Sequence, residues 1–400
     1  MWTRMPLGAL ADVQLGKMLS PKARTGTSSY PYLRNSNVQW GRLELNDVLE
    51  MDFDEDERAK FSLRRGDLLV CEGGEPGRCA VVEHDMPDMF FQKALMRVRP
   101  REERLDTRFL HRLMEFAAHR GTFSRDGNQA TIAHFPAVKL NALEVPLPAP
   151  AEQRRIAAIL DKADAIRRKR KAATALTEEL LQSTFMEMFG DPLSNPKGWP
   201  VRPLGQAIER FEAGWSANGD ARVRTSDEYG VLKVSAVTSG YFRPEEHKAV
   251  AATAVDRELI TPRRRDLLFS RANTRELVAA SCLVEQDEPN LFLPDKLWRI
   301  VPNCEVATPE YLRFLLAHGR FRQEVTKRAT GTSGSMLNIS MGKVRSIDLP
   351  TPPVALQERF STTVWRAYDL RAKLLAANVV SADLFDSLLQ RAFRGELPTA

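Results

Sequence analysis

The chain has 400 residues, of which 43% are hydrophobic and 28% charged, and its formal net charge is +6. This composition is that of an ordinary globular protein and excludes collagen-like, fully disordered and disulfide-scaffold proteins. The small basic excess is a mild hint of a polyanionic partner. The sequence contains no apolar run typical of a signal peptide or a membrane span, so we expect a cytoplasmic protein without a membrane role.

The first globular segment, residues 1–149, mixes short strand-like runs with a helical run. Residues 67–71 and 95–99 have the character of strands, residues 71–78 form a Gly-rich turn, and residues 107–119 have the character of a helix. A Pro-rich stop then precedes a long helical segment at 150–191. A second globular segment at 192–352, with a helix expected over 309–327, and a second long helical segment at 353–400 complete the chain.

The two long helices are predicted from periodicity. Residues 153–189 and 357–393 contain neither Pro nor Gly, and apolar residues recur at steps of three and four, as in the seam of a coiled coil. Arg170 falls on this seam, where its aliphatic stem can pack, although the basic run 167–171 is more typical of a solvated face or of a contact with DNA or an acidic partner. The predicted seam residues are Ile156, Ile159, Ile166 and Leu180, and Phe360, Leu370, Leu374, Leu384 and Leu388.

The chain repeats itself over a long period. Pro6-Leu7-Gly8 returns as Pro203-Leu204-Gly205, and the run 64–69 returns at 263–268. From Pro146 and Pro350 onward the two copies stay in step, without a gap, to the ends of the long helices. We therefore expect a mixed α/β (α+β) fold with two globular domains, separated by two long antiparallel coiled-coil helices in a pseudo-two-fold arrangement.

The sequence contains no convergent catalytic set. It lacks a P-loop, lacks the Asn/Asp-Pro-Pro-aromatic motif of DNA amino-methyltransferases, and lacks the clustered carboxylates and lysine of a metal-dependent nuclease. Its histidines and cysteines do not have metal-ligand spacing. The sequence therefore predicts a protein that is not an enzyme and holds no metal.

Several segments carry a resemblance to a known family. Residues 146–189, with Glu152-Gln153-Arg154-Arg155 and Ile156 to Asp161, resemble the central conserved region of type I restriction–modification specificity subunits. Residues 388–397 resemble the C-terminal conserved region of that family, and residues 32–38 and 71–77 resemble its target-recognition domains.

This resemblance implies a non-catalytic, sequence-specific DNA-binding subunit. In such proteins two target-recognition domains each read half of a gapped, bipartite target in double-stranded DNA. The two helices set the distance between them and dock two modification (methyltransferase) subunits, and restriction (endonuclease) subunits join the complex. S-adenosylmethionine, ATP and Mg²⁺ are then expected on the partner subunits, with no cofactor in this chain. Two alternatives are a coiled-coil scaffold without a DNA role and a self-sufficient DNA methyltransferase or nuclease.

Two equivalent loops are the candidates for contact with DNA. In the register of the helices, residues 127–131 correspond to 331–335, and Lys139 to Lys343. Gly and small polar side chains allow close approach to phosphate, and Asn or Gln can read adenine. The alternatives are ordinary surface turns and, for Arg34 and Lys233, caps of strand ends. The candidate residues are Arg34, Arg125, Asn128, Gln129, Thr131, Lys139, Lys233, Arg328, Thr332, Ser333, Ser335 and Lys343.

Overall fold

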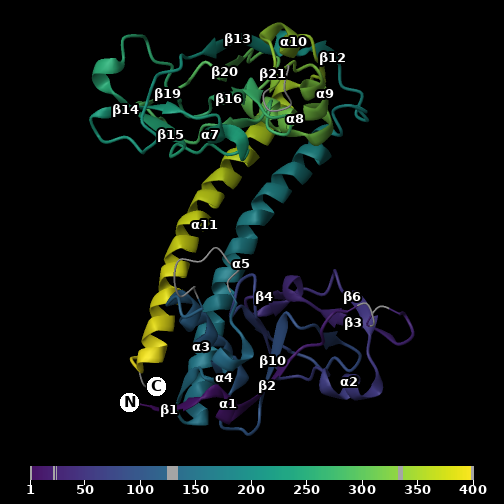
Figure 1. The fold of residues 1–400 in the computed structure, drawn as a ribbon. Helices are drawn as coiled ribbons and strands as arrows, with labels where there is room; N and C mark the ends of the chain where they lie inside the picture. Colours follow the sequence, from purple (N-terminus) through teal and green to yellow (C-terminus); the bar gives the residue numbers. More distant parts are fainter. Residues whose placement is uncertain (1, 21–22, 24, 124–133, 332–336, 398–400) are drawn as a thin grey trace. The chain divides into compact units, whose positions relative to one another are not determined.

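The computed structural model describes residues 2–20, 23, 25–123, 134–331 and 337–397 (Figure 1). Contacts divide the chain into two compact units, which we call unit 1 (Met1–Arg170 and Ala377–Ala400) and unit 2 (Lys171–Ala376). The long helices expected from the sequence are α5 (Pro150–Phe189) and α11 (Val354–Arg394), and each contributes one half to each unit.

Unit 1 is a mixed α/β domain. Its central antiparallel sheet has the order β2-β10-β7-β8, and a second sheet has the order β6-β3-β9, in which β3 and β9 are parallel. Before α5, its elements are β1 (Thr3–Pro6), α1 (Leu7–Leu10), β2 (Ala11–Leu15), β3 (Ser29–Leu33), η2 (Asn35–Asn37), β4 (Val38–Gln39), β5 (Arg42–Leu43), β6 (Leu49–Asp52), α2 (Glu55–Lys60), β7 (Leu68–Cys71), β8 (Cys79–Val81), β9 (Phe90–Phe91), β10 (Leu95–Pro100), α3 (Thr107–His119), α4 (Ala137–Asn141) and β11 (Glu144–Leu147).

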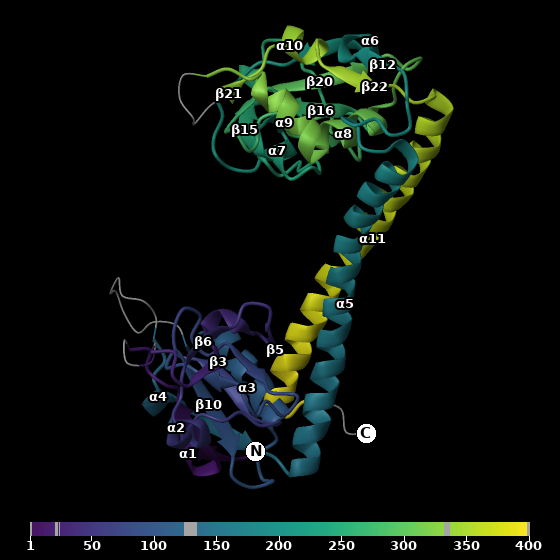
Figure 2. The ribbon, with the colours of Figure 1, turned by 90° about the vertical axis from the view of Figure 1, so that its right-hand side faces the viewer.

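Unit 2 has the same sheet orders, β13-β20-β16-β18 and β15-β14-β19. Figure 2 shows the neighbouring central strands β16 and β20. Between the long helices, its elements are β12 (Val201–Pro203), α6 (Leu204–Ala207), β13 (Ile208–Ala213), β14 (Glu228–Leu232), α7 (Ser235–Thr238), β15 (His247–Ala251), η3 (Ala252–Ala254), β16 (Leu267–Ser270), β17 (Ala272–Asn273), β18 (Ser281–Leu283), β19 (Leu291–Phe292), β20 (Leu297–Pro302), α8 (Pro309–Ala317), α9 (Gly319–Lys327), β21 (Leu337–Asn338), α10 (Met341–Arg345) and β22 (Asp348–Pro350). The mixed α/β class and the internal duplication are thus confirmed.

The prediction of a single helix over 309–327 is wrong in one respect. The segment is two helices, α8 and α9, because the backbone of His318 is extended (φ −60°, ψ 123°) and interrupts the helical path. The apolar pattern on both sides has helical spacing, so the sequence alone did not reveal the break.

The repeated Pro-Leu-Gly motif has a structural reason. Pro6 and Pro203 have extended backbones and precede the short helices α1 and α6. A Cβ atom at Gly8 would lie 2.7 Å from Asn141 Oδ1, and one at Gly205 would lie 3.1 Å from Arg345 Cβ. Glycine is therefore retained in both copies because α1 packs closely on α4, and α6 on α10.

Each globular domain is fastened to the first turn of its long helix by one buried glutamine. Gln153 Oε1 accepts a hydrogen bond from Asp106 N (2.8 Å), and its Nε2 donates to the carbonyls of Arg104 and Pro148 (2.7 and 2.9 Å). Gln357 makes the same three bonds, from Thr308 N (2.9 Å) and to the carbonyls at 306 and 352 (3.0 and 2.8 Å). We call this arrangement the glutamine clamp.

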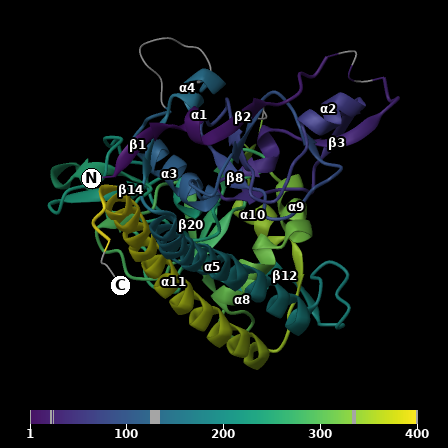
Figure 3. The same ribbon diagram turned by 90° about the horizontal axis from the view of Figure 1, so that it is seen from below.

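In each unit the two long-helix segments lie side by side and run antiparallel (Figure 3). In unit 1, Arg170 Nη1 of α5 donates to the carbonyl of Ala377 (3.1 Å), and the Arg167 guanidinium stacks on Phe385 of α11 (4.4 Å). Arg170 also donates to the Ser381 hydroxyl. In unit 2, Phe185 packs against Phe360 (ring centroids 5.7 Å apart). The predicted seam position of Arg170 is therefore confirmed.

Part of the predicted seam is wrong. Ile156 and Phe360 are fully buried, and Ile159, Leu374 and Leu388 are partly buried. However, Ile166, Leu180, Leu370 and Leu384 are 44%, 56%, 50% and 55% exposed. After Leu180 and Leu384 the next residue, Leu181 or Phe385, is buried, whereas Arg167 and Arg371, which follow Ile166 and Leu370, are partly buried.

The physical reason for the shift is the helical period. A strict 3.5-residue repeat describes a two-helix seam, whereas an α-helix has 3.6 residues per turn and drifts from that repeat. Toward its ends each helix is also covered by a globular domain, since Ile156 and Leu160 belong to the core of unit 1 and Phe360 and Val364 to that of unit 2. The buried stripe of each helix therefore follows its contacts with both the other long helix and the globular domain.

A glycine turn in unit 1 gives a first prediction. Gly77 has φ +86°, and a Cβ atom there would lie 2.3 Å from the buried ring of Phe123. Gly77→Ala should therefore destabilise the protein by about 2–4 kcal/mol, measured by urea unfolding. Gly66→Ala is the matched control, because Gly66 has φ +92° but open space at its Cβ, and its cost should be about 1 kcal/mol. Equal losses of stability in the two variants would contradict a clash with the Phe123 ring as the cause.

A buried histidine in α3 gives a pH prediction. Burial, with help from the neighbouring Arg112 charge, lowers the pKa of His111 to about 3. The unfolded chain takes up this proton below pH ~6.5 whereas the folded one does not, so the stability that neutral His111 permits is lost as the pH falls from ~6.5 toward 3. His111→Gln should remove about 2 kcal/mol of the loss between pH 6.5 and 4.5 in urea unfolding. His119→Gln, at a half-exposed histidine, should not remove it.

Candidate nucleic-acid interface

Two equivalent short helices carry the two candidate lysines. Lys139 lies in α4 and is exposed, and Lys343 lies in α10 and is partly exposed. The residue after each, Leu140 and Val344, is fully buried and anchors the helix to its domain. The folding of the same short helix in both units thus directs one lysine outward from each.

The candidate loops 127–131 and 331–335 lie outside the described residues, apart from Gly331, but the chain that follows them is described. His134 forms a β-bridge with Gly73, and Phe135 N donates to the carbonyl of Glu72 (2.7 Å). In unit 2, Asn338 pairs with Ala272, and Ile339 N donates to the carbonyl of Arg271 (2.9 Å). The same main-chain bonds therefore anchor the end of each loop to the turn that follows β7 or β16.

The side chains around these equivalent main-chain bonds differ between the two units. The register of the paired strands makes Glu72 equivalent to Arg271, because Val70 pairs with Met96 as Phe269 pairs with Trp298. At the same level, His134 of unit 1 is replaced by Asn338 in unit 2. Carboxylate, guanidinium, imidazole and amide groups have different hydrogen-bonding capacities. The two units thus have the same main-chain framework but side chains with different hydrogen-bonding groups.

Three of the candidate cations are paired with carboxylates of their own unit. Arg34 forms an ion pair with Asp47, and Lys233 Nζ lies 3.5 Å from Glu246 Oε2. Arg328, at the end of α9, donates to the carbonyl of Glu324 (2.8 Å) and lies 3.6 Å from its carboxylate. Their positive charge is partly compensated, and their contact with DNA stays a prediction. Arg125, Asn128, Gln129, Thr131, Thr332, Ser333 and Ser335 lie outside the described residues.

The sequence reasoning missed a cluster beside the loop of unit 1. Asn35 Nδ2 donates to the carbonyl of Gly73 (2.9 Å), and Arg78 Nη2 donates to the carbonyl of Asn35 (2.9 Å). Trp40 Nε1 donates to Glu75 (2.6 Å). This cluster joins the segment after β3 to the Gly-rich turn and to the residue His134. The two segments that resemble target-recognition domains, 32–38 and 71–77, were the available signal, but nothing in the sequence shows that they touch.

The described residues contain no group of three or more His, Cys, Asp or Glu placed to hold a metal ion. No helix in the described part of the chain is long and apolar enough to cross a membrane.

Residues 1–176 match the family model of the type I restriction modification DNA specificity domain. The specificity subunit of the type I restriction enzyme EcoEI from Escherichia coli is 29% identical over 206 residues, which are 50% of this chain but only 35% of that protein. The EcoKI specificity subunit from Escherichia coli K12 is 23% identical over 383 residues, 92% of this chain and 82% of that protein. The chain is therefore similar to type I restriction–modification specificity subunits, and its first 176 residues are assigned to their DNA specificity domain.

Solved structures agree with this assignment at the level of the fold. The type I S subunit from M. genitalium has a TM-score of 0.60 and 14% identity, and the match covers 100% of this chain and 97% of that one. A chain from a structure of complex assembly and conformational transition of the type I R-M system has a TM-score of 0.55 and 17% identity, with coverage of 99% and 98%.

The long helices α5 and α11 expose apolar side chains in equivalent sets. Unit 1 exposes Ile166, Val380 and Leu384, and unit 2 exposes the equivalent residues Leu370, Leu176 and Leu180. In the internal repeat Ile166 corresponds to Leu370, and Leu180 to Leu384. Exposed apolar clusters are typical of protein interaction sites. The four residues that sequence analysis misplaced in the seam therefore belong to two matching surfaces, which we call the helix patches.

Most side chains of the basic run 167–171 make contacts within unit 1. Asp164 pairs with Arg167 (2.6 Å) and with Arg168 (2.7 Å), and Arg168 also donates to the carbonyl of Trp40 (3.0 Å). Lys169 and Lys171 are exposed. Three of the five cations thus hold the helix to its domain and to α11.

Proposed function

We propose that this chain is the specificity subunit of a type I restriction–modification complex, that it binds double-stranded DNA, and that it recognises a bipartite, non-palindromic and gapped target. Each unit reads one half of the target through the loop beside α4 or α10, with Lys139 and Lys343 positioned to contact phosphates. The chain itself performs no chemistry and directs adenine methylation or DNA cleavage by its partner subunits.

The observation that carries this proposal is the shared loop framework with divergent side chains. The main-chain bonds of Phe135 to Glu72 and of Ile339 to Arg271 are equivalent, while the side chains around them differ. A duplicated binding framework suits two half-sites of the same duplex, and different side chains suit different base sequences.

The partners are inferred from the helix patches. Two equivalent apolar sets favour two copies of one partner, which we propose to be the modification subunits, with restriction subunits joining that assembly. S-adenosylmethionine, ATP and Mg²⁺ are then held by the partner subunits, and the complex acts in the cytoplasm.

Exchange of one recognition domain tests the proposal. Replacing residues 200–349 with the corresponding domain of another family member should change one half of the methylated target and leave the other half unchanged, because each domain is a bounded unit. The readout is methylation mapping of the reconstituted complex. The reciprocal exchange of the first domain is the control. A change in both halves, or a contiguous palindromic target, would contradict the two-module interpretation.

A scaffold without a DNA role is the alternative class. Fluorescence anisotropy with a duplex containing the mapped target distinguishes a DNA-binding subunit from a scaffold. A DNA-binding subunit should bind the duplex with an affinity that falls steeply as the salt concentration rises. Lys139→Ala and Lys343→Ala should each weaken binding, whereas Lys162→Ala, at an exposed lysine of α5, should not. Methylation by the purified chain alone would instead support a self-sufficient enzyme.

A further inference from the structure

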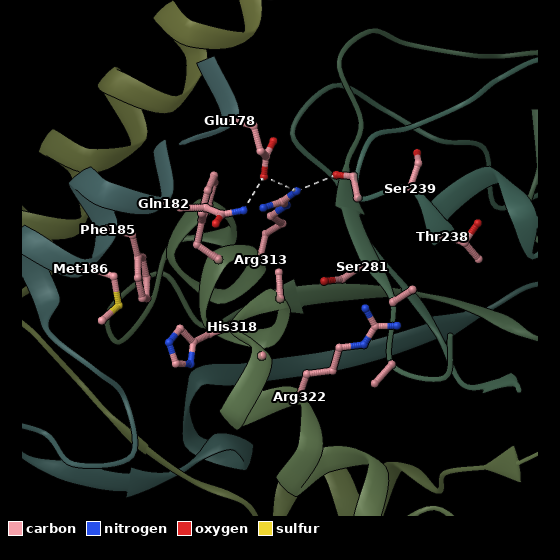
Figure 4. A pocket seen from close by; sticks show the side chains of 16 residues that line it. Glu178, Gln182, Phe185, Met186, Thr238, Ser239, Ser281, Arg313, His318 and Arg322 are labelled. Atoms are coloured by element: carbon pink, nitrogen blue, oxygen red, sulfur yellow. Dashed lines mark hydrogen bonds and ion pairs between the residues drawn. The ribbon is translucent and has the colours of Figure 1, made fainter. Parts of the chain in front are cut away.

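Unit 2 contains a cavity of about 460 Å³ that has no assigned role (Figure 4). One wall is the α5 segment at residues 178–186, and the others come from α7, the start of β18, and the helices α8 and α9. Its volume lies within the range of small-molecule sites in proteins, about 300–1,000 Å³. The cavity belongs entirely to unit 2 and is distinct from the loops proposed to contact DNA.

Three buried polar atoms at the cavity have no hydrogen-bond partner among the described residues. They are the hydroxyl of Ser281, the Nε of Arg313 and the Nδ1 of His318. Ser281 is only 4% exposed and Arg313 only 3%. Buried polar groups in proteins are almost always paired, and an unpaired one costs about 1–3 kcal/mol. Several such atoms around one cavity indicate that the cavity is built for a polar ligand.

The charges at the cavity favour an anion. Glu178 lies 3.8 Å from Arg313 and accepts hydrogen bonds from Gln182 (3.3 Å) and Tyr241, so its charge is already compensated. Arg322 donates to the carbonyls of Glu276 and Val278 (2.8 and 3.4 Å) and forms no ion pair with a described carboxylate. Burial also lowers the pKa of Arg322. One guanidinium is therefore left without a counter-charge, which suits a monoanion.

Part of the lining is apolar. Phe185 of α5 and Phe314 of α8 stack on each other at the cavity, with ring centroids 6.1 Å apart, and Met186 and Ala317 also line it. Such a wall accommodates a ring or a short aliphatic body but offers nothing to a second charged group. A ligand with one carboxylate and an apolar body matches both the charge and the lining.

The sister domain shows that the fold does not require this site. At the equivalent positions unit 1 has Glu115 in place of Ala317 and Phe116 in place of His318, and Phe116 stacks on Phe393 (ring centroids 5.1 Å apart). Ser281 is replaced by Cys79 and Arg313 by His111. The donor set is thus a feature of unit 2 alone and not a property of the duplicated module.

We propose that this cavity binds a small organic monocarboxylate, with its carboxylate at Arg322 and Ser281 and its apolar body against the stacked rings of Phe185 and Phe314. Because α5 and the recognition domain of unit 2 both line the cavity, the bound acid would fasten this helix segment to the domain. The proposal is independent of DNA binding, and neither depends on the outcome of the other.

Isothermal titration calorimetry of the full chain with sodium benzoate tests the proposal. Benzamide is the neutral isostere, and we expect it to bind at least ~10-fold more weakly, because a charge-assisted hydrogen bond is lost. Arg322→Gln should weaken benzoate binding by at least ~10-fold and Ser281→Ala by about 3–10-fold. Arg320→Gln is the matched control, because Arg320 is exposed, pairs with Asp191 (3.1 Å) and does not line the cavity.

Circular dichroism confirms that each variant is folded, and Ser281→Ala provides a second test if Arg322→Gln is unstable. Benzoate binding that is lost in Arg322→Gln or Ser281→Ala and kept in Arg320→Gln supports the site. The proposal is overturned if the wild-type chain gives no binding heat with benzoate, if benzamide binds equally well, or if neither cavity variant changes the affinity. Tighter binding of inorganic phosphate than of benzoate would also overturn the carboxylate assignment.

Discussion

Arg112→Ala should destabilise unit 1 by about 3–5 kcal/mol, a large part of the stability of a typical domain. Arg112 is buried in α3 and pairs with Glu115 (2.5 Å), Asp161 (2.8 Å) and Asp164 (3.3 Å). Burial raises the pKa of Glu115, whereas at Asp164 burial is outweighed by Arg112 and its neighbouring arginines, which lower the pKa. Without Arg112 these carboxylates remain buried with too little positive charge.

Urea unfolding measures the loss, and two comparisons identify its cause. Arg108→Ala is the matched control, because Arg108 lies one turn earlier, is 55% exposed and pairs with Glu83 (2.8 Å), so it should cost less than about 1 kcal/mol. The penalty of Arg112→Ala should also shrink below pH ~4, where protonation removes the uncompensated carboxylate charge. A penalty that does not change with pH would assign the loss to packing.

Unit 2 has uncharged side chains at the four positions equivalent to this network. In the register of the repeat, Arg112 and Glu115 correspond to Phe314 and Ala317, and Asp161 and Asp164 correspond to Trp365 and Tyr368. Trp365 and Tyr368 pack edge to face, with ring centroids 5.5 Å apart. A buried ionic network can be replaced by apolar residues of similar volume with little loss of stability. The equivalent residues of unit 2 therefore provide a natural design for repairing the Arg112 variant.

The second large effect concerns the length of the long helices. Inserting four residues after Thr174 in α5 and after the equivalent Asn378 in α11 adds about 6 Å and slightly more than one turn to each helix. The residues beyond the insertion keep nearly the same face. If the helices set the spacing of the half-sites, the methylated target should keep its bases, and its gap should widen by up to about two base pairs at ~3.4 Å each.

A two-residue insertion at the same positions is the control. It rotates the residues beyond it by about 200°, so that they face away from the partner helix, and it should reduce folding or assembly. Methylation-site mapping of the reconstituted complexes distinguishes the variants. An unchanged gap after the four-residue insertion would show that the modification subunits, and not these helices, set the spacing.

The sequence predicted the long helices because their signal is local. Neither helix contains an interior Pro or Gly, and an apolar stripe at helical period is visible without knowledge of any partner. The exact buried face could not be predicted from local sequence, because Leu160 and Phe385 are buried by a globular domain as well as by the other helix. The buried face is therefore shifted by one residue from the predicted seam at Leu180 and Leu384, and the predicted positions Ile166 and Leu370 are exposed.

The sheets and the interface depended on contacts between distant residues. Strand β2 pairs with β10, so that Val13 meets Val98, and no short-range pattern specifies that pairing. The equivalence of Lys139 and Lys343 could be read from the repeat. The pairing of Arg34 with Asp47 could not, because the two are joined by an irregular segment whose path depends on the folded domain.

The glutamine clamp has a consequence for how such proteins diversify. On the side of the globular domain, the side-chain hydrogen bonds of Gln153 and Gln357 go to main-chain atoms, at positions 104 and 106 in one unit and 306 and 308 in the other. These bonds depend on the path of the backbone and do not select the side chains at these four positions. A domain exchanged by recombination can therefore keep this joint even where its residues at these positions differ.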